Sequence, residues 1–193
     1  MGNNDIVDVL VVGAGASGAA FSWSLATSGI NVMCLEQGRW VNSNEYPTNK
    51  LNWELSRIKD FAKDPNVRNL PEDYPINSIN SPITPLMYNA VGGSTIHWSA
   101  QFPRLKPSDF RVKTLDGVAD DWPFSYQQLE HYFDLNDKIM GIAGITGDPM
   151  YPRKSPRQTG PLSLGKAGNV IVKGLDKLGW HWWPSDAAIL TDN

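Results

Sequence analysis

The chain has 193 residues, of which 41% are hydrophobic and 19% are charged, and its formal net charge is −3. This composition is typical of a folded globular protein with one core or the start of a second, and the slight acidity favours neither nucleic acid nor an anionic membrane as a partner. No run approaches the ~20 apolar residues of a membrane span, and residues 1–6 lack the pattern of a cleavable leader. We therefore expect a cytoplasmic protein, unless a partner subunit carries it to the periplasm.

The first predicted elements are a strand, a glycine-rich turn and a helix. Asp8 is followed by the apolar run 9–12, and the turn 13–18 comes directly after it. A helix rich in small residues is predicted over 17–28, with Gly29 as its C-terminal cap. This order of elements is typical of the opening of a nucleotide-binding domain.

The glycines of the turn have the Gly-x-Gly-x-x-Gly spacing of a dinucleotide site. Gly13 allows the tight turn, Gly15 lets the backbone approach phosphates, and Gly18 lets the helix pack closely on the strand. The N–H groups at the helix start, including those of Ala16 and Ser17, and the positive end of the helix dipole favour an anion. The pattern predicts a pyrophosphate site, and the alternative is a purely structural turn.

A second apolar strand is predicted over 30–35 and ends at Glu36. An acidic side chain at this place accepts hydrogen bonds from the ribose of an adenosine and would repel a 2′-phosphate. Neither strand alternates in polarity, which predicts a parallel sheet covered on both faces. Cys34 lies inside the second strand and is expected to be buried; as the single cysteine it can form no disulfide within the chain.

The rest of the chain alternates between loops and helices. A loop is predicted over 37–50, a helix over 51–63, a proline-punctuated excursion over 65–87, a helix over 126–140 begun by Ser125, a linker over 144–165 and a helix over 166–178. No further apolar strand with a crossover helix follows residue 36, so we expect the N-terminal piece of a longer protein.

A second glycine segment combines backbone donors, hydroxyls and rings. Its residues are Gly92, Gly93, Ser94 and Thr95, followed by His97, Trp98 and Ser99. The first four could form another phosphate contact, and the last three could border a ring system. A tight turn beside a hydrogen-bonded histidine is the competing interpretation, and spacing alone leaves both open.

Three stretches together resemble one family. The first glycine turn with Glu36, the run Val91-Gly-Gly-Ser-Thr-Ile-His-Trp98, and the run Asp121-Trp-Pro-Phe-Ser-Tyr-Gln-Gln-Leu-Glu-His-Tyr132 look like the glucose-methanol-choline (GMC) oxidoreductases. The chain is most similar to the bacterial branch with FAD-dependent sugar and sugar-acid dehydrogenases. The resemblance implies FAD as cofactor and an alcohol, often a sugar hydroxyl, as substrate.

The resemblance also implies roles for residues of this chain. The first turn would hold the FAD pyrophosphate and Glu36 the adenosine ribose, while residues 92–95 would line the phosphate and ribityl side. His97 falls where several members attach FAD covalently; a histidine packed on the flavin without a bond is the other possibility. Trp98 would lie beside the ring system, and Ser99 near its reactive nitrogen.

The catalytic base of the family is not expected in this chain. GMC enzymes use a histidine paired with a second histidine or an asparagine near the C-terminus, and we expect that motif beyond Asn193. His131 is interpreted as a solvated or capping residue and His181 as packing. The run 180–183, Trp-His-Trp-Trp, could be a sugar platform, although packing is the simpler interpretation. No metal site is expected.

The predicted fold class is α/β: a Rossmann-like FAD-binding β-α-β start over residues 1–110, and the beginning of a mixed α+β substrate or cap region over 111–193. The parent would be an FAD-dependent oxidoreductase acting on CH–OH donors, and this fragment alone would be inactive. An electron-acceptor subunit is a possible partner. The alternatives are an NAD-dependent dehydrogenase and a non-catalytic nucleotide-binding fragment.

Overall fold

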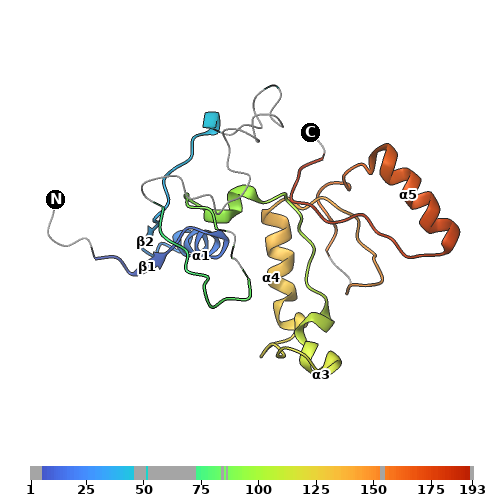
Figure 1. Cartoon of the computed structure of the whole chain (residues 1–193), viewed down its shortest axis with the longest axis horizontal. Helices are drawn as coiled ribbons and strands as arrows, with labels where there is room; N and C mark the ends of the chain where they lie inside the picture. The colour runs from blue at the N-terminus through green and yellow to red at the C-terminus, as the bar shows by residue number, and fades with distance from the viewer. Residues whose placement is uncertain are drawn as a thin grey trace. The chain divides into compact units, whose positions relative to one another are not determined.

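Figure 1 shows the computed structural model, which describes residues 6–45, 51, 73–83, 85, 87–152 and 155–191. Contacts divide the chain into two compact units, Met1–Trp98 and Ser99–Asn193. Nearly all of the helix predicted over 51–63 and the first part of the proline-punctuated excursion lie outside the described residues. The domain boundary expected at residue 110 stays a prediction.

Unit 1 begins with the predicted β-α-β arrangement. Strand β1 (Val9–Val12) pairs in parallel with strand β2 (Val32–Leu35), and helix α1 (Ala16–Ala26) connects them. Asp8 and Asn31 align the strand starts, because each backbone N–H donates to the other residue: Asp8 to the Asn31 carbonyl at 2.9 Å, and Asn31 to the Asp8 carboxylate at 3.0 Å. The sheet therefore places both strand ends beside the glycine turn.

The end of α1 differs slightly from its prediction. The helix stops at Ala26 with Thr27 as its C-cap, two residues before the predicted end. The Thr27 hydroxyl donates to the Ser24 carbonyl at 2.8 Å, so a side chain satisfies part of the last turn. Gly29, at φ +75°, lies beyond the cap, where the chain turns toward β2.

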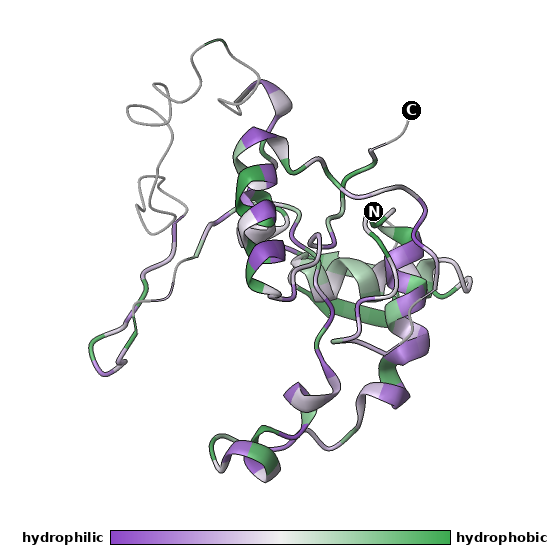
Figure 2. Ribbon diagram, turned by 90° about the vertical axis from the view of Figure 1, so that its right-hand side faces the viewer, coloured by the Kyte–Doolittle hydropathy of each residue, from purple (hydrophilic) through white to green (hydrophobic). Residues whose placement is uncertain are grey.

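One face of the sheet is open in the described part of the chain. Leu10 is 52% exposed and Val12 82%, and Met33 and Leu35 of β2 are also exposed. Both strands are drawn in the apolar colour in Figure 2. The prediction that Cys34 is buried is wrong, because the sheet among the described residues has two strands and nothing continues it beyond β2.

The described part of unit 1 also contains two short 3₁₀ helices that the sequence did not predict. Helix η1 (Ser43–Glu45) lies in the segment predicted as a loop, and η3 (Gly93–His97) lies in the second glycine segment. Gly92 begins η3 at φ +89°, a backbone conformation that favours glycine.

Unit 2 consists of helices joined by long loops. Its elements are η4 (Pro107–Phe110), α3 (Val112–Asp116), α4 (Tyr126–Ile139) and α5 (Gly165–Leu178). The predictions for α4 and α5 are confirmed to within one residue at each end, whereas η4 and α3 were not predicted. Ser125 begins α4, and its N–H donates to the Gln128 side chain at 2.8 Å.

The core of unit 2 forms where α4 meets η4 and the loops. Phe110, Tyr126, Ile142 and Ala143 are almost completely buried. Ala143 also forms isolated bridges with Thr159 and Ala187, so the described part of the unit has bridges between its loops rather than a sheet. In the part of the chain that the structure describes, no helix is long and apolar enough to cross a membrane.

Candidate nucleotide-binding site

The first glycine turn lies at the carboxyl ends of β1 and β2. Gly13 has φ +92°, and its N–H donates to the Leu35 carbonyl at 2.7 Å. A Cβ on Gly18 would lie 1.9 Å from the Gly13 carbonyl oxygen, so the helix can approach the turn this closely only with glycine there. A Cβ on Gly15 would meet no atom within 4 Å. Gly18 is thus required by internal packing, whereas space beside Gly15 is open for a ligand.

The N-terminus of α1 can receive an anion. Gly15 is its N-cap without a side-chain hydrogen bond, and the first turn contains no acidic residue. The N–H groups of Ala16, Ser17 and Gly18 are among those that a helix start leaves without partners in the helix. Together with the helix dipole they form the donor set that a pyrophosphate requires.

Glu36 follows β2 and connects two backbone segments. Its carboxylate accepts from the N–H of Gly38 at 2.9 Å and of Ala14 at 2.8 Å. These two bonds, that of Gly38 first, hold the pKa of Glu36 below its ordinary value, so the side chain is ionised at neutral pH. Each oxygen keeps a second lone pair that could accept from a ribose hydroxyl.

The second glycine segment is a hydrogen-bonded turn. The Gly93 N–H donates to the Ala90 carbonyl at 2.7 Å, and the Thr95 hydroxyl donates to the Gly92 carbonyl at 2.6 Å. The Ser94 hydroxyl accepts from the Tyr88 N–H at 3.2 Å. Both hydroxyls therefore stabilise the turn itself. The sequence analysis considered them only as possible contacts to a cofactor.

His97 ends this turn beside an aromatic ring. Its imidazole meets Tyr88 edge to face, with ring centroids 4.5 Å apart. Burial lowers the pKa of His97 below its ordinary value, which favours the neutral imidazole at pH 7. Trp98 is partly exposed, and Ser99 belongs to the second unit, so the geometry of unit 1 does not bear on the contact predicted for Ser99.

The sequence interpretation missed Gly38. A Cβ on this residue would lie 2.2 Å from the carbonyl carbon of Ala90, and the next residue, Arg39, accepts from the Val91 N–H at 2.9 Å. The segment after β2 thus runs directly against the start of the second glycine segment. The only signal in the sequence is a glycine two residues after Glu36, which by itself is uninformative.

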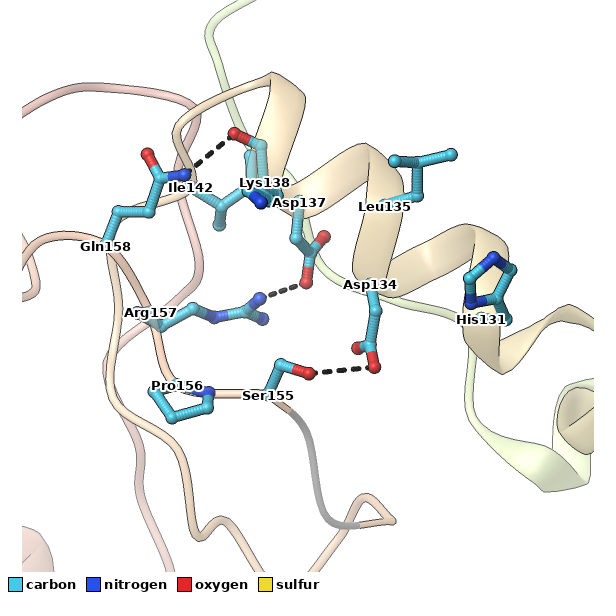
Figure 3. A pocket seen from close by; sticks show the side chains of 10 residues that line it. All are labelled: His131, Asp134, Leu135, Asp137, Lys138, Ile142, Ser155, Pro156, Arg157 and Gln158. Atoms are coloured by element: carbon cyan, nitrogen blue, oxygen red, sulfur yellow. Dashed lines mark hydrogen bonds and ion pairs between the residues drawn. The ribbon is translucent and has the colours of Figure 1, made fainter.

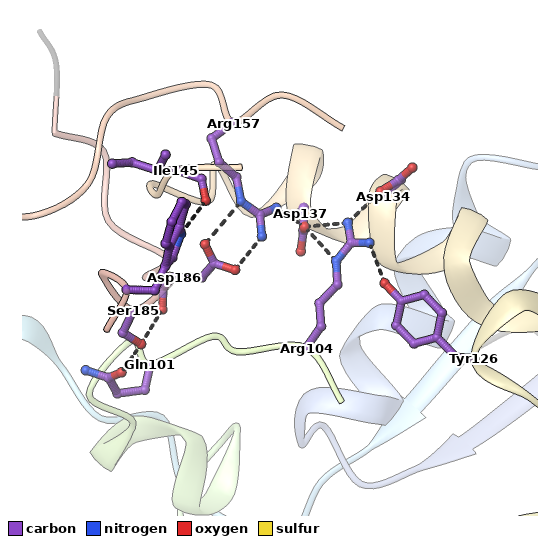
Figure 4. A network of polar contacts seen from close by, with 10 residues as sticks. Gln101, Arg104, Tyr126, Asp134, Asp137, Ile145, Arg157, Ser185 and Asp186 are labelled. Carbon is purple, nitrogen blue, oxygen red and sulfur yellow. Dashed lines mark hydrogen bonds and ion pairs between the residues drawn. The ribbon is translucent and has the colours of Figure 1, made fainter. Parts of the chain in front are cut away.

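A second polar cluster lies in unit 2. Figure 4 shows Arg104 and Arg157 approaching the Asp137 side chain of α4. Arg104 donates to Asp137 through Nε at 3.0 Å and Nη2 at 2.6 Å, and Arg157 also pairs with Asp186, from Nε to Oδ1 at 3.2 Å. Asp134 completes the cluster as a further partner of Arg104.

The charges of this cluster compensate one another. The arginine side chains are only 1% and 4% exposed, for Arg104 and Arg157 respectively. Burial by itself would lower the pKa of Arg104, but its hydrogen bonds to Asp134, Tyr126 and Asp137 together raise that pKa above its ordinary value. The cluster joins three loops to α4, and we interpret it as structural.

A pocket of about 420 Å³ borders the same cluster. Figure 3 shows Asp134, Asp137 and Arg157 on its wall, with His131 one turn before Asp134 on α4. None of the residues predicted to contact a cofactor lines it. His131 is exposed, as its interpretation as a solvated residue requires.

The aromatic run 180–183, interpreted from the sequence as packing or a sugar platform, also lies in unit 2. His181 stacks on Trp183 at 6.2 Å between centroids, and its Nε2 lies 3.0 Å from the Asp148 carboxylate. The Trp182 indole donates to Asp176 at 2.8 Å, and Trp180 is exposed. Among the described residues, no three histidine, cysteine, aspartate or glutamate side chains gather as a metal site.

Comparison with known proteins defines the class of unit 1. Residues 11–74 match the family model of an NAD(P)-binding Rossmann-like domain. This span contains α1, β2, Glu36 and all of the first glycine turn, so the geometry and the match agree on a nucleotide-binding α/β domain.

Relatives extend the comparison over nearly the whole chain. 2-Methyl-1,2-propanediol dehydrogenase of Mycolicibacterium austroafricanum is 47% identical over 190 residues, covering 97% of this chain and 34% of the relative. Fructose dehydrogenase large subunit of Gluconobacter japonicus is 26% identical, covering 92% of this chain and 35% of the relative. Gluconate 2-dehydrogenase flavoprotein of Pantoea cypripedii is 24% identical, covering 72% and 26%.

The chain belongs to the glucose-methanol-choline-like oxidoreductases, as its three motifs predicted. It spans about a third of the length of the curated relatives it matches.

Proposed function

We propose that the chain supplies the FAD-binding part of an oxidoreductase that oxidises CH–OH groups of alcohols or sugars. The observation that carries the proposal is the connection of the two glycine turns within unit 1. An open helix N-terminus with an ionised Glu36 suits an adenosine diphosphate half. The second turn, attached through residues 38–39 and 90–91, suits the remaining half of the same dinucleotide.

Each predicted site residue has a role in this proposal. In the first turn Gly13, Gly15, Ala16, Ser17 and Gly18 hold the pyrophosphate, and Glu36 accepts from the adenosine ribose. In the second segment Gly92, Gly93, Ser94 and Thr95 line the phosphate and ribityl side, and His97, Trp98 and Ser99 border the ring system. Bound FAD would supply the hydride acceptor.

A neutral imidazole at His97 suits this position. Without a proton it adds no positive charge beside the ring system, and it keeps one nitrogen as a nucleophile or acceptor. A covalent bond from this nitrogen and simple packing are therefore both compatible with the proposal. Digestion of the purified protein separates them, since only a covalent link leaves flavin on the peptide that contains His97.

The proton of the alcohol would be removed by a base outside residues 1–193. Neither His131 nor His181 matches the paired histidine motif of the family, so neither is assigned this task. The names of three relatives suggest diols, ketoses or sugar acids as substrates. One relative is named as a large subunit, which supports an electron-acceptor subunit as a partner of this protein. The protein would then act in the cytoplasm or, if the partner carries it across the membrane, in the periplasm.

The test uses the full-length protein under anaerobic conditions. We expect the purified protein to be yellow, and its visible flavin absorbance to bleach when 2-methyl-1,2-propanediol, fructose or gluconate is added. Dye reduction with the same compounds should follow. A colourless protein that binds NADH would support the NAD-dependent alternative, and a flavoprotein that no alcohol or sugar reduces would contradict the proposed reaction.

A further inference from the structure

Gly38 lies where two backbone segments touch. An added Cβ would come within 2.2 to 2.4 Å of three backbone atoms of Ala90: its carbonyl carbon, Cα and nitrogen. Because the obstacle is backbone, no side-chain rotation could relieve the overlap. The adjacent hydrogen bond from the Val91 N–H to the Arg39 carbonyl, 2.9 Å long, holds the two segments together.

Gly38 is also attached to the first glycine turn. Its N–H donates to one oxygen of Glu36 at 2.9 Å, and the other oxygen accepts from the Ala14 N–H at 2.8 Å. Ala14 lies between the first two glycines of that turn. One carboxylate therefore fixes the distance between the turn and the segment that contains Gly38.

The same contacts continue into the second turn. The Ala90 carbonyl, on the residue that Gly38 touches, accepts from the Gly93 N–H at 2.7 Å. The path from Ala14 through Glu36, Gly38 and Ala90 to Gly93 consists entirely of direct contacts. If the segment at Gly38 moved, it would displace the second glycine turn. The first glycine turn would stay in place, because the bond between Glu36 and Ala14 holds it.

We propose that Gly38 is a positioning residue that sets the separation of the two glycine turns, so that a single extended dinucleotide meets both. The inference rests on the proposed function of these turns. A ribose hydroxyl on Glu36 would add a third hydrogen bond to the carboxylate that already holds Ala14 and Gly38. Binding at the adenosine side thereby orders the second turn.

The experiment compares FAD with ADP, a probe for the adenosine side alone. Full-length apoprotein, prepared under riboflavin limitation, is titrated with each nucleotide by calorimetry. We expect Gly38→Ala to weaken FAD binding about tenfold or more and to change ADP binding less than about threefold. The matched control is Gly174→Ala on α5, where an added Cβ meets no atom within 4 Å; it should change neither affinity.

Equal losses for both nucleotides would overturn the inference, because Gly38 would then only maintain the fold of unit 1. No loss for either would overturn it as well. Wild-type protein that binds neither nucleotide would instead refute the proposed function on which it rests.

A measurement on the wild type covers the case in which Gly38→Ala does not fold. Hydrogen exchange of the apoprotein is followed with and without ADP. We expect ADP to slow exchange at the amides of Val91 and Gly93, which donate to Arg39 and Ala90. Unchanged exchange at both amides would overturn the inference.

Discussion

Gly15 and Gly18 lie in one turn but are glycines for different physical reasons. At Gly18 there is no room for a side chain, because an added Cβ would lie 1.9 Å from the carbonyl oxygen of Gly13. Gly15 has an ordinary backbone conformation, with φ −63°, and open space around it. The first constraint belongs to the fold, and we propose that the second comes from the ligand.

The two glycines should therefore respond differently to replacement by alanine: one variant should mainly lose stability, and the other should mainly lose affinity for FAD. Gly18→Ala should lower the free energy of unfolding by about 3 kcal/mol because the helix must move away from the turn. Gly15→Ala should cost about 1 kcal/mol or less, as alanine is only a poorer N-cap, but should weaken FAD binding more than tenfold. Thermal unfolding and FAD titration of both variants check this; equal stability losses with equal affinities would contradict it.

Glu36 makes the stability of unit 1 depend on pH. Its pKa lies below the ordinary 4.5 because the N–H groups of Gly38 and Ala14 stabilise the carboxylate. A lowered pKa stabilises the fold above pH 4.5, and this contribution is lost as the pH falls through the folded-state value.

Glu36→Gln should therefore be less stable than the wild type at pH 7, by about 1 kcal/mol, since an amide has one oxygen for two N–H donors. The difference should shrink as the pH is lowered below 4.5. Thermal unfolding of both proteins between pH 7 and pH 3 measures it, and a gap that is constant or that widens toward acid would show that the two bonds do not stabilise the carboxylate.

At the scale of elements, α4 is held by the ion cluster around Asp137. This residue pairs with two arginines whose side chains are almost fully buried. Taking away their shared carboxylate leaves two buried arginines with only Asp134 and Asp186 to compensate their charge, which is more costly than losing a surface pair.

Asp137→Asn should lower the free energy of unfolding by about 3 to 5 kcal/mol. The matched control is Asp120→Asn, since Asp120 pairs with Lys113 while the two side chains are 87% and 63% exposed, and it should cost less than about 1 kcal/mol. Thermal unfolding of the full-length variants compares them. Similar small losses for the two variants would show that the cluster does not stabilise unit 2.

The same elements show what a sequence can predict. The β-α-β start, α4 and α5 follow from continuous apolar patterns and from the cap at Ser125, which act over a few residues. Helix α3 depends on contacts outside its own five residues: Asp121 accepts from the Thr114 N–H at 3.0 Å, and the flanking rings of Phe110 and Trp122 meet at a tilt. Such short elements leave little periodic signal.

The candidate site follows from the sequence only in part. Both glycine turns and Glu36 stand out through spacing and resemblance, and their roles as cofactor contacts stay predictions. Gly38 and the Asp137 cluster were missed, since their partners come from segments far apart in the chain. The burial predicted for Cys34 was wrong, because it assumed a wider sheet than the described residues form.

At the scale of the whole molecule, the open apolar face of the sheet is the main feature to explain. Leu10, Val12, Met33 and Leu35 are exposed on adjacent strands, in a chain that spans about a third of its relatives. We expect the longer protein to cover these side chains, as a parallel sheet is normally covered on both faces.

Residues 1–193 expressed alone should therefore bind an apolar dye such as ANS several-fold more strongly than the full-length protein, and should not turn over any alcohol. Val12→Thr with Leu35→Thr should lower dye binding by the isolated chain. In the full-length protein the same pair should instead lower stability by about 2 kcal/mol. Weak dye binding by the isolated chain would contradict this account of the face.

The central claim is that unit 1 holds FAD, and identification of the nucleotide carried by the full-length protein tests it most directly. The purified protein is denatured and digested, and flavins and nicotinamides are separated by chromatography with mass detection. The account predicts about one FAD per chain, either free or on the peptide that contains His97. A protein that carries NAD, or no dinucleotide after incubation with FAD, would contradict it.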